Sequence, residues 1–136
     1  LSPDGRWLAY VSDESGTPEV YVRPFPGPGG FAQVSNGGGT EPRWSPAGRA
    51  IFYRKGDAMM QASVRTQPGF TVSDVRQLFT GPFAKTDLYP NYDVGRDGRS
   101  FVMVRPAQSG GQTVMVVLNW FANLARSGGR VSGATQ

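Results

Sequence analysis

One turn signal recurs along this chain and constrains its fold more than any other feature. Asp4-Gly5-Arg6 and Asp97-Gly98-Arg99 are identical, and Ala47-Gly48-Arg49 is a near copy between them. Each copy is followed at once by a short apolar stretch. A repeat spacing of about 40 to 50 residues is typical of architectures built from four-stranded units. Repeats of this kind commonly serve as binding scaffolds, so a chain built from them need contain no catalytic machinery.

The residues after each turn alternate as a β-strand does. When the copies are aligned on their glycines, Leu8, Ile51 and Phe101 fall at one position, and Tyr10, Tyr53 and Met103 follow two residues later. Positions two apart lie on one face of a strand, and β-branched and aromatic residues favour strands. The expected strands are Trp7–Val11, Glu19–Val22, Phe31–Ser35, Glu41–Trp44, Ala50–Tyr53, Met59–Val64, Val75–Phe79, Asn91–Val94, Ser100–Val104 and Thr113–Leu118.

These strands divide the all-β chain into three antiparallel units and a tail. Residues 1–36 are a unit that lacks its first strand, residues 37–80 are a complete four-stranded unit, and residues 81–118 lack the fourth strand. Residues 119–136 are expected to form a short helix followed by a flexible Gly/Ser-rich tail. Because the chain starts inside the first turn motif without a Met, we interpret it as a fragment of a longer protein.

The repeated turn has a simple physical basis. Pro presets its own φ, Asp accepts hydrogen bonds from nearby backbone N–H groups, and Gly adopts a positive φ. The second copy has Ala47 in place of Asp, and the third has Gly95-Arg96 in place of Ser-Pro. All three copies keep the glycine. The motif is therefore interpreted as a boundary between strands that carries no chemistry of its own.

Composition removes several function classes. The chain has no His and no Cys, and so it lacks the commonest general base, the commonest zinc ligand and all thiol chemistry. The net charge of +4 comes from residues spread over the whole length, without a basic run. We interpret these charged residues as part of a solvated surface, and we predict no nucleic-acid partner. The longest aliphatic run, Val114–Leu118, is far shorter than the roughly 20 residues of a membrane helix, so no membrane insertion by this segment is expected.

Motifs for known chemistries are missing or incomplete. The glycine runs 27–30 and 37–39 are not followed by Lys-Ser or Lys-Thr, so they are read as turns and not as phosphate loops. Neither the Asp-Phe-Gly of kinases nor the Gly-x-Ser-x-Gly of serine hydrolases occurs. Asp13-Glu14 is too short an acidic run for a calcium loop. We predict no catalytic residue, no metal and no cofactor.

The opening residues resemble a known repeat. The segment 1–12, Leu-Ser-Pro-Asp-Gly-Arg-Trp-Leu-Ala-Tyr-Val-Ser, and the strand Glu19–Val22 resemble the PD40 repeat, a WD40-like repeat of TolB-like β-propellers, over residues 1 to about 118. The segments Glu19–Pro26, Gly38–Trp44 and Asn119–Phe121 look like the C-terminal propeller end of bacterial serine/threonine protein kinases. The resemblance implies three blades of a partial propeller ring, without catalytic residues, and a periplasmic or extracytoplasmic location. A cytoplasmic location stays open.

Two functional readings follow from this resemblance. In the first, the chain is a non-catalytic module that binds a protein or a small ligand. In the second, it is the C-terminal region of a multidomain enzyme, either a serine/threonine kinase or a prolyl-oligopeptidase-type peptidase, whose catalytic domain is absent from this sequence.

Propeller ligands generally sit at the mouth of the central channel, which suggests two candidate loops here. These are residues 36–43 and 82–91, and an ordinary surface role for them stays open. The second loop places a cation, an anion and an aromatic ring within five residues. Self-association through open blade edges is a further expectation. Trp7, Tyr10, Trp44 and Tyr53 are read as inter-blade core, with a stacking platform as the alternative. The candidate partner-binding residues are Glu41, Arg43, Lys85, Asp87 and Tyr89.

Overall fold

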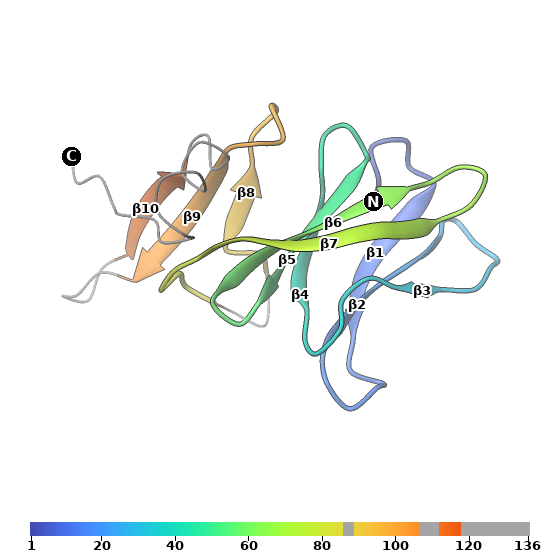
Figure 1. The fold of residues 1–136 in the computed structure, drawn as a ribbon, viewed down its shortest axis with the longest axis horizontal. Helices are drawn as coiled ribbons and strands as arrows, with labels where there is room; N and C mark the ends of the chain where they lie inside the picture. The colour runs from blue at the N-terminus through green and yellow to red at the C-terminus, as the bar shows by residue number, and fades with distance from the viewer. Residues whose placement is uncertain (86–88, 107–111, 118–136) are drawn as a thin grey trace.

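The computed structural model describes residues 1–85, 89–106 and 112–117, the last segment by its backbone alone. The described residues form three antiparallel sheets in chain order (Figure 1). The first contains β1 (Trp7–Ser12), β2 (Glu19–Pro24) and β3 (Ala32–Gln33). The second contains β4 (Thr40–Trp44), β5 (Ala50–Lys55), β6 (Ala58–Arg65) and β7 (Thr71–Thr80). The third contains β8 (Tyr92–Val94), β9 (Phe101–Pro106) and β10 (Gln112–Val117). The prediction of an all-β chain with antiparallel sheets is confirmed.

The repeated turn forms the same structure three times. Gly5, Gly48 and Gly98 have φ values of 71°, 69° and 65°. The N–H of each glycine donates a hydrogen bond of 2.9 Å to the carbonyl three residues earlier. The residue that supplies this carbonyl also donates its own N–H, over 2.8 Å, to the carbonyl five residues later. The positive φ explains why the glycine is present in every copy.

Side chains between the sheets make two cores. The first and second sheets enclose one cluster, whose members include Val20, Val22, Ile51 and Tyr53. The second and third sheets enclose the other, whose members include Phe52, Met59, Phe79, Phe101 and Met103. The alternation along β5 produces this arrangement, because Ile51 and Tyr53 face the first sheet while Ala50 and Phe52 face the third. Each sheet is thus held to the next mainly by apolar packing.

The two aligned apolar positions noted in the sequence face the preceding sheet. Ile51 and Tyr53 point toward the first sheet, and Phe101 and Met103 point toward the second. The indole rings of Trp7 and Trp44 pack against Phe70, with ring centroids 5.5 and 6.3 Å apart. The expected core role of these aromatic residues is therefore seen directly for both tryptophans and for Tyr53.

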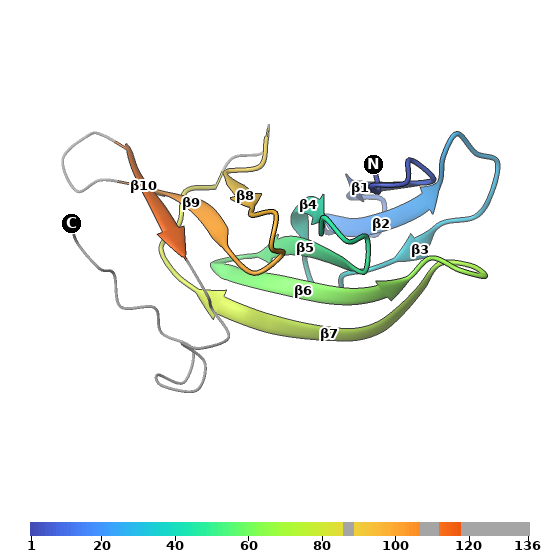
Figure 2. The same cartoon turned by 90° about the horizontal axis from the view of Figure 1, so that it is seen from above.

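One edge strand of each sheet lies on the same side of the molecule. Figure 2 shows β4 and β8 along one side of the molecule and β7 along the opposite side. Each of β1, β4 and β8 is an edge strand of its sheet, and β1 packs directly beside β4. We call these three strands the inner edge strands. Within the described residues, no helix is long and apolar enough to cross a membrane. The helix expected after residue 118 lies outside the described residues.

Candidate functional site

A groove of about 280 Å³ runs where the inner edge strands meet. Its walls come from all three repeated units and combine apolar side chains with a larger polar surface. The lining residues are Leu1, Pro3, Ala9, Pro42, Arg43, Trp44, Ser45, Pro46, Asp93 and Val94. We call this feature the inner groove. Since β1, β4 and β8 are edges, backbone groups without a sheet partner border it.

Arg43 is the charged centre of the inner groove. Its Nη1 lies 3.4 Å from Oδ1 of Asp93, and its guanidinium carbon lies 5.9 Å from the centroid of the Tyr92 ring. Both Tyr92 and Asp93 belong to β8, so the Arg43 side chain reaches from β4 in the second sheet to the third sheet. The Nε of Arg43 is buried and has no acceptor among the described residues. This atom is a buried donor without a partner, on a residue that lines the groove.

Trp44 supplies a second unused donor. Its indole ring packs edge-on against Phe70 inside the first core. Its Nε1 is buried and also lacks an acceptor among the described residues. A buried donor without an acceptor costs roughly 1–3 kcal/mol. Arg43 and Trp44 are neighbours in β4, and their side chains lie on opposite faces of the strand, Trp44 toward the first core and Arg43 toward the third sheet.

Glu41 ties the second sheet to the third. It lies in β4 with a φ of 54°, a left-handed value that costs a non-glycine residue roughly 1–2 kcal/mol. Its carboxylate accepts a hydrogen bond of 3.0 Å from the N–H of Asn91, and its carbonyl accepts one of 2.7 Å from the Tyr92 hydroxyl. The pairing of β4 with β5 shifts register at this point. Through these contacts Glu41 has a structural role, because it joins the second sheet to the third. Its side chain is buried and does not line the inner groove.

A buried arginine lies behind this contact. Arg54 is 1% exposed, and its Nε and Nη1 have no acceptor among the described residues. Its Nη2 donates to the carbonyl of Gly56 over 3.3 Å, and its guanidinium carbon lies 5.6 Å from the Phe83 ring centroid. Burial lowers the pKa of Arg54, while the nearby Glu41 carboxylate acts in the opposite direction. Arg54 could not be singled out from the sequence, because its burial follows from sheet packing.

The other candidate residues lie in the connection between β7 and β8. Lys85 forms an ion pair of 2.6 Å with Asp57, which belongs to the β5–β6 hairpin, and both side chains are at least half exposed. The pKa of Asp57 is lowered, first by its hydrogen bond from Lys85. Tyr89 is 67% exposed. Asp87 lies outside the described residues. The structure thus brings Arg43 into the inner groove and places Lys85 and Tyr89 in the β7–β8 connection.

The polar side chains that line the groove are few. Arg43 and Asp93 pair with each other, and the Ser45 hydroxyl accepts hydrogen bonds from the N–H groups of Arg49 and Ala50. Across the part of the chain that the structure describes, no three acidic residues gather as a metal site would require. Orphaned donors next to apolar walls are the features by which a surface recognises acceptor-bearing ligands.

Comparison with known proteins places the fold. No family model matches this sequence, and no curated protein matches it. Among solved structures, TolB from Acinetobacter baumannii aligns with a TM-score of 0.59 and 19% identity, over 88% of this chain and 29% of that chain. The chain is similar in fold to TolB-like β-propeller proteins.

A second solved structure supports the same conclusion. Oligogalacturonate lyase from Vibrio parahaemolyticus aligns with a TM-score of 0.57 and 18% identity, over 76% of this chain and 26% of that chain. The present chain spans less than a third of the length of either protein. At these identities the likeness concerns the fold alone. The expected likeness to TolB-like propellers is confirmed at that level, and the closer likeness to kinases stays a prediction.

Proposed function

We propose that this chain is a non-catalytic binding module whose inner groove receives an extended peptide. The observation that carries this proposal is a groove bordered by the edge strands β1, β4 and β8, whose lining includes Arg43 and Trp44, two residues with buried N–H donors that lack acceptors among the described residues. An extended peptide offers main-chain carbonyls and N–H groups that can pair with an exposed sheet edge. Apolar walls from Pro3, Pro42 and Val94 suit the side chains of such a peptide.

The open strand edges support a peptide over a compact small molecule. An edge strand presents a row of unpaired N–H and C=O groups, and an extended peptide can pair with them. Ala9 illustrates the point because it lies on the edge strand β1 and lines the groove. The corresponding residue of the second sheet, Phe52, is paired with Arg43 of β4.

The test begins with a library of random peptides of about eight residues, selected on the immobilised full chain. Selected peptides are synthesised with blocked ends, and their dissociation constants are measured by calorimetry for three variants. Trp44→Phe keeps an aromatic ring, although a smaller one, and removes the N–H, so we expect binding to weaken about three- to tenfold. Arg43→Ala removes the donor and the charge, and we expect about a tenfold loss or more.

Trp7→Phe is the matched control. Trp7 packs against the same Phe70 ring but does not line the inner groove, so its substitution should leave affinity within about twofold. Equal losses in Trp7→Phe and Trp44→Phe would indicate a general effect on the core and would count against the groove. Failure to select any peptide that distinguishes wild type from Arg43→Ala would also contradict the proposal.

The identity of the whole protein is a separate part of the proposal. The segments Glu19–Pro26 and Gly38–Trp44 resemble the C-terminal propeller end of bacterial serine/threonine kinases, and we extend that resemblance to a parent protein with an extracytoplasmic propeller. The peptidase parent is the less favoured alternative. Sequencing the gene upstream distinguishes them, because a kinase parent requires a kinase domain and a membrane span before these residues. Further β-repeats behind a secretion signal, without a kinase domain, would contradict it.

A further inference from the structure

The first sheet has one face that no other sheet covers within the described residues. Ala9 of β1 packs into the first core, so the alternation along the strand turns Leu8 and Tyr10 to the opposite face. The Tyr10 ring stacks on the Tyr21 ring with centroids 5.8 Å apart, and the Phe31 ring meets Tyr21 edge-on at 5.5 Å. Phe31 is 65% exposed. We call this surface, formed by Leu8, Tyr10, Tyr21 and Phe31, the leading face.

The third sheet has a free face of the opposite kind. Phe101 and Met103 of β9 pack against the second sheet. The alternation along β9 therefore turns Val102 and Val104 away from the second sheet. Val102 is 38% exposed, and no other sheet covers it within the described residues. We call this surface, which contains Val102 and Val104, the trailing face.

The contacts between sheets inside the chain follow one rule of register. The third residue after each turn glycine faces the preceding sheet, as Ile51 and Phe101 do, and the fourth faces the following sheet, as Phe52 does. These two positions meet between the second and third sheets, because the rings of Phe52 and Phe101 lie edge-on with centroids 5.0 Å apart. Leu8 is a third residue and Val102 is a fourth residue, so the rule assigns each of them a partner from another sheet of the same repeat.

From this register we propose that the leading face of one copy of this chain receives the trailing face of a second copy. Val102 of the second copy then lies against Leu8 as Phe52 lies against Phe101 within the chain. A two-fold axis lets each copy offer its trailing face to the other, so the free faces of both copies are covered. Burial of the exposed apolar side chains drives the association, which uses the faces of the sheets and not their strand edges.

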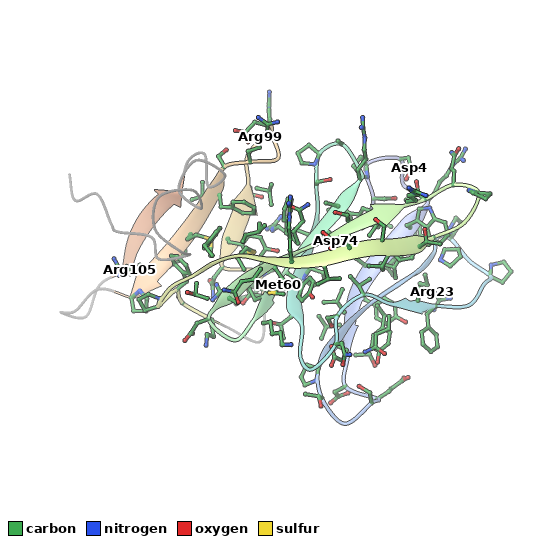
Figure 3. The ribbon with its side chains drawn as sticks, viewed as in Figure 1. Asp4, Arg23, Met60, Asp74, Arg99 and Arg105 are labelled. Carbon is green, nitrogen blue, oxygen red and sulfur yellow. The ribbon has the colours of Figure 1, made fainter. Side chains whose placement is uncertain are left out.

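The arrangement of the sheets favours a closed pair over an open chain of copies. The inner edge strands lie on one side of the molecule, so successive sheets fan about that side (Figure 2). A head-to-tail contact closes into a ring where its rotation allows, and otherwise extends into a filament. Figure 3 labels Arg23 on the first sheet and Arg105 on the third sheet at opposite ends of the molecule. The two free faces of a single copy are therefore too far apart to cover each other.

The first experiment exchanges charges across the proposed interface. Leu8→Lys and Val102→Glu each place an unpaired charge in both contacts of a dimer, so we expect either substitution to weaken association at least about a hundredfold. In a mixture of the two variants, a heterodimer has one contact in which the two charges pair and one contact that is wild type. We therefore expect the mixture to dimerise again.

Sedimentation velocity on the full chain measures the mass of each species. The wild type should sediment at twice the mass of one chain, with a dissociation constant of about 1 µM or tighter, since standard interfaces fall in that range. Circular dichroism establishes that the charged variants are folded. Recovery in the mixture is specific to the proposed pairing, because a general loss of structure in either variant would not be repaired by the other.

The second experiment uses the absence of cysteine from the sequence. Leu8→Cys and Val102→Cys are mixed and treated with a short bismaleimide, which suits the spacing of about 10 Å between packed sheets. We expect a crosslinked product of twice the mass of one chain. Val75→Cys is the matched control for Val102→Cys, because Val75 is 43% exposed on β7 of the second sheet. Mixed with Leu8→Cys, it should give at least about tenfold less product, since proximity raises the local thiol concentration.

The outcomes either support the proposal or overturn it. A wild-type dimer, monomeric charged variants and a dimer in their mixture support it. A wild-type monomer, charged variants that still dimerise, a mixture that stays monomeric, or equal crosslinking by Val75→Cys and Val102→Cys overturns it, and larger assemblies overturn the closed pair. If Leu8→Lys fails to fold, the wild-type mass and the crosslinking still decide. None of the substituted residues lines the inner groove, so this result and peptide binding there are independent.

Discussion

Removing one hydroxyl from Tyr92 should loosen the contact between the second and third sheets. Tyr92 is 4% exposed. Its hydroxyl donates over 2.7 Å to the carbonyl of Glu41 and lies 3.1 Å from the carbonyl of Phe52. In Tyr92→Phe the ring packing is kept, while the buried carbonyls lose their donor. A buried polar group left without its partner costs roughly 1–3 kcal/mol. For a chain of this length that corresponds to a fall in Tm of roughly 3–12 °C.

Urea denaturation followed by tryptophan fluorescence measures the effect. The midpoint should fall while the slope m is unchanged, because the surface exposed on unfolding is the same. Tyr10→Phe is the matched control. Tyr10 stacks on Tyr21 at the outer face of the first sheet, with ring centroids 5.8 Å apart, so its change should stay within about 0.5 kcal/mol. Equal effects of the two substitutions would refute the bridging role of Tyr92.

The pH dependence of the same residue gives an independent check. Burial raises the pKa of Tyr92 above the ordinary tyrosine value of 10.0. A group whose pKa is raised by folding contributes stability below its unfolded pKa, and that stability is lost as the pH rises further. Wild-type stability should therefore fall above about pH 10, and the fall should be smaller in Tyr92→Phe. Identical alkaline profiles of the two proteins would show that this phenol titrates as it does in the unfolded chain.

Three further predictions concern the core and the β3–β4 loop. Phe101→Ala should lower the free energy of unfolding by about 3–5 kcal/mol, because Phe101 is 0% exposed, whereas Val102→Ala on the exposed face of the same strand should cost less than about 1 kcal/mol; equal urea midpoints would contradict the sheet packing. Burial would raise the pKa of Glu19, but hydrogen bonds from Ser35 and the β3–β4 loop outweigh it and lower the pKa. Stability that depends on Glu19 should thus be present above pH 4.5 and be lost as the pH falls, and Glu19→Gln should flatten the acid limb of a stability profile. Gly39→Ala should destabilise the chain, since its Cβ would overlap the Ser35 side chain; an unchanged Tm would show that the loop can move aside.

Strand positions were predictable because they depend on local pattern. The alternation after each glycine located β1, β5 and β9, and the apolar positions facing each core follow from the same period. The turn itself was predictable from Pro, Asp and Gly. The bounds of the short outer strand β3 were less so, because only Ala32 and Gln33 pair with β2.

The candidate site was only partly predictable, because it depends on contacts between units. Arg43 was a candidate from its loop position, but nothing local shows that its Nε is buried or that Asp93 is its partner. Glu41 was expected to face a partner, yet it adopts a positive φ and binds Asn91 of the next unit.

The most direct measurement on the proposed binding function is the indole N–H signal of Trp44. A ¹H–¹⁵N spectrum of the full chain, with the tryptophan signals assigned from the Trp7→Phe and Trp44→Phe variants, is recorded while a selected peptide is added. We expect the Trp44 signal to move downfield as its Nε1–H gains an acceptor, and the Trp7 signal to stay in place. A bound peptide that leaves the Trp44 signal unchanged would contradict the inner groove as the binding site.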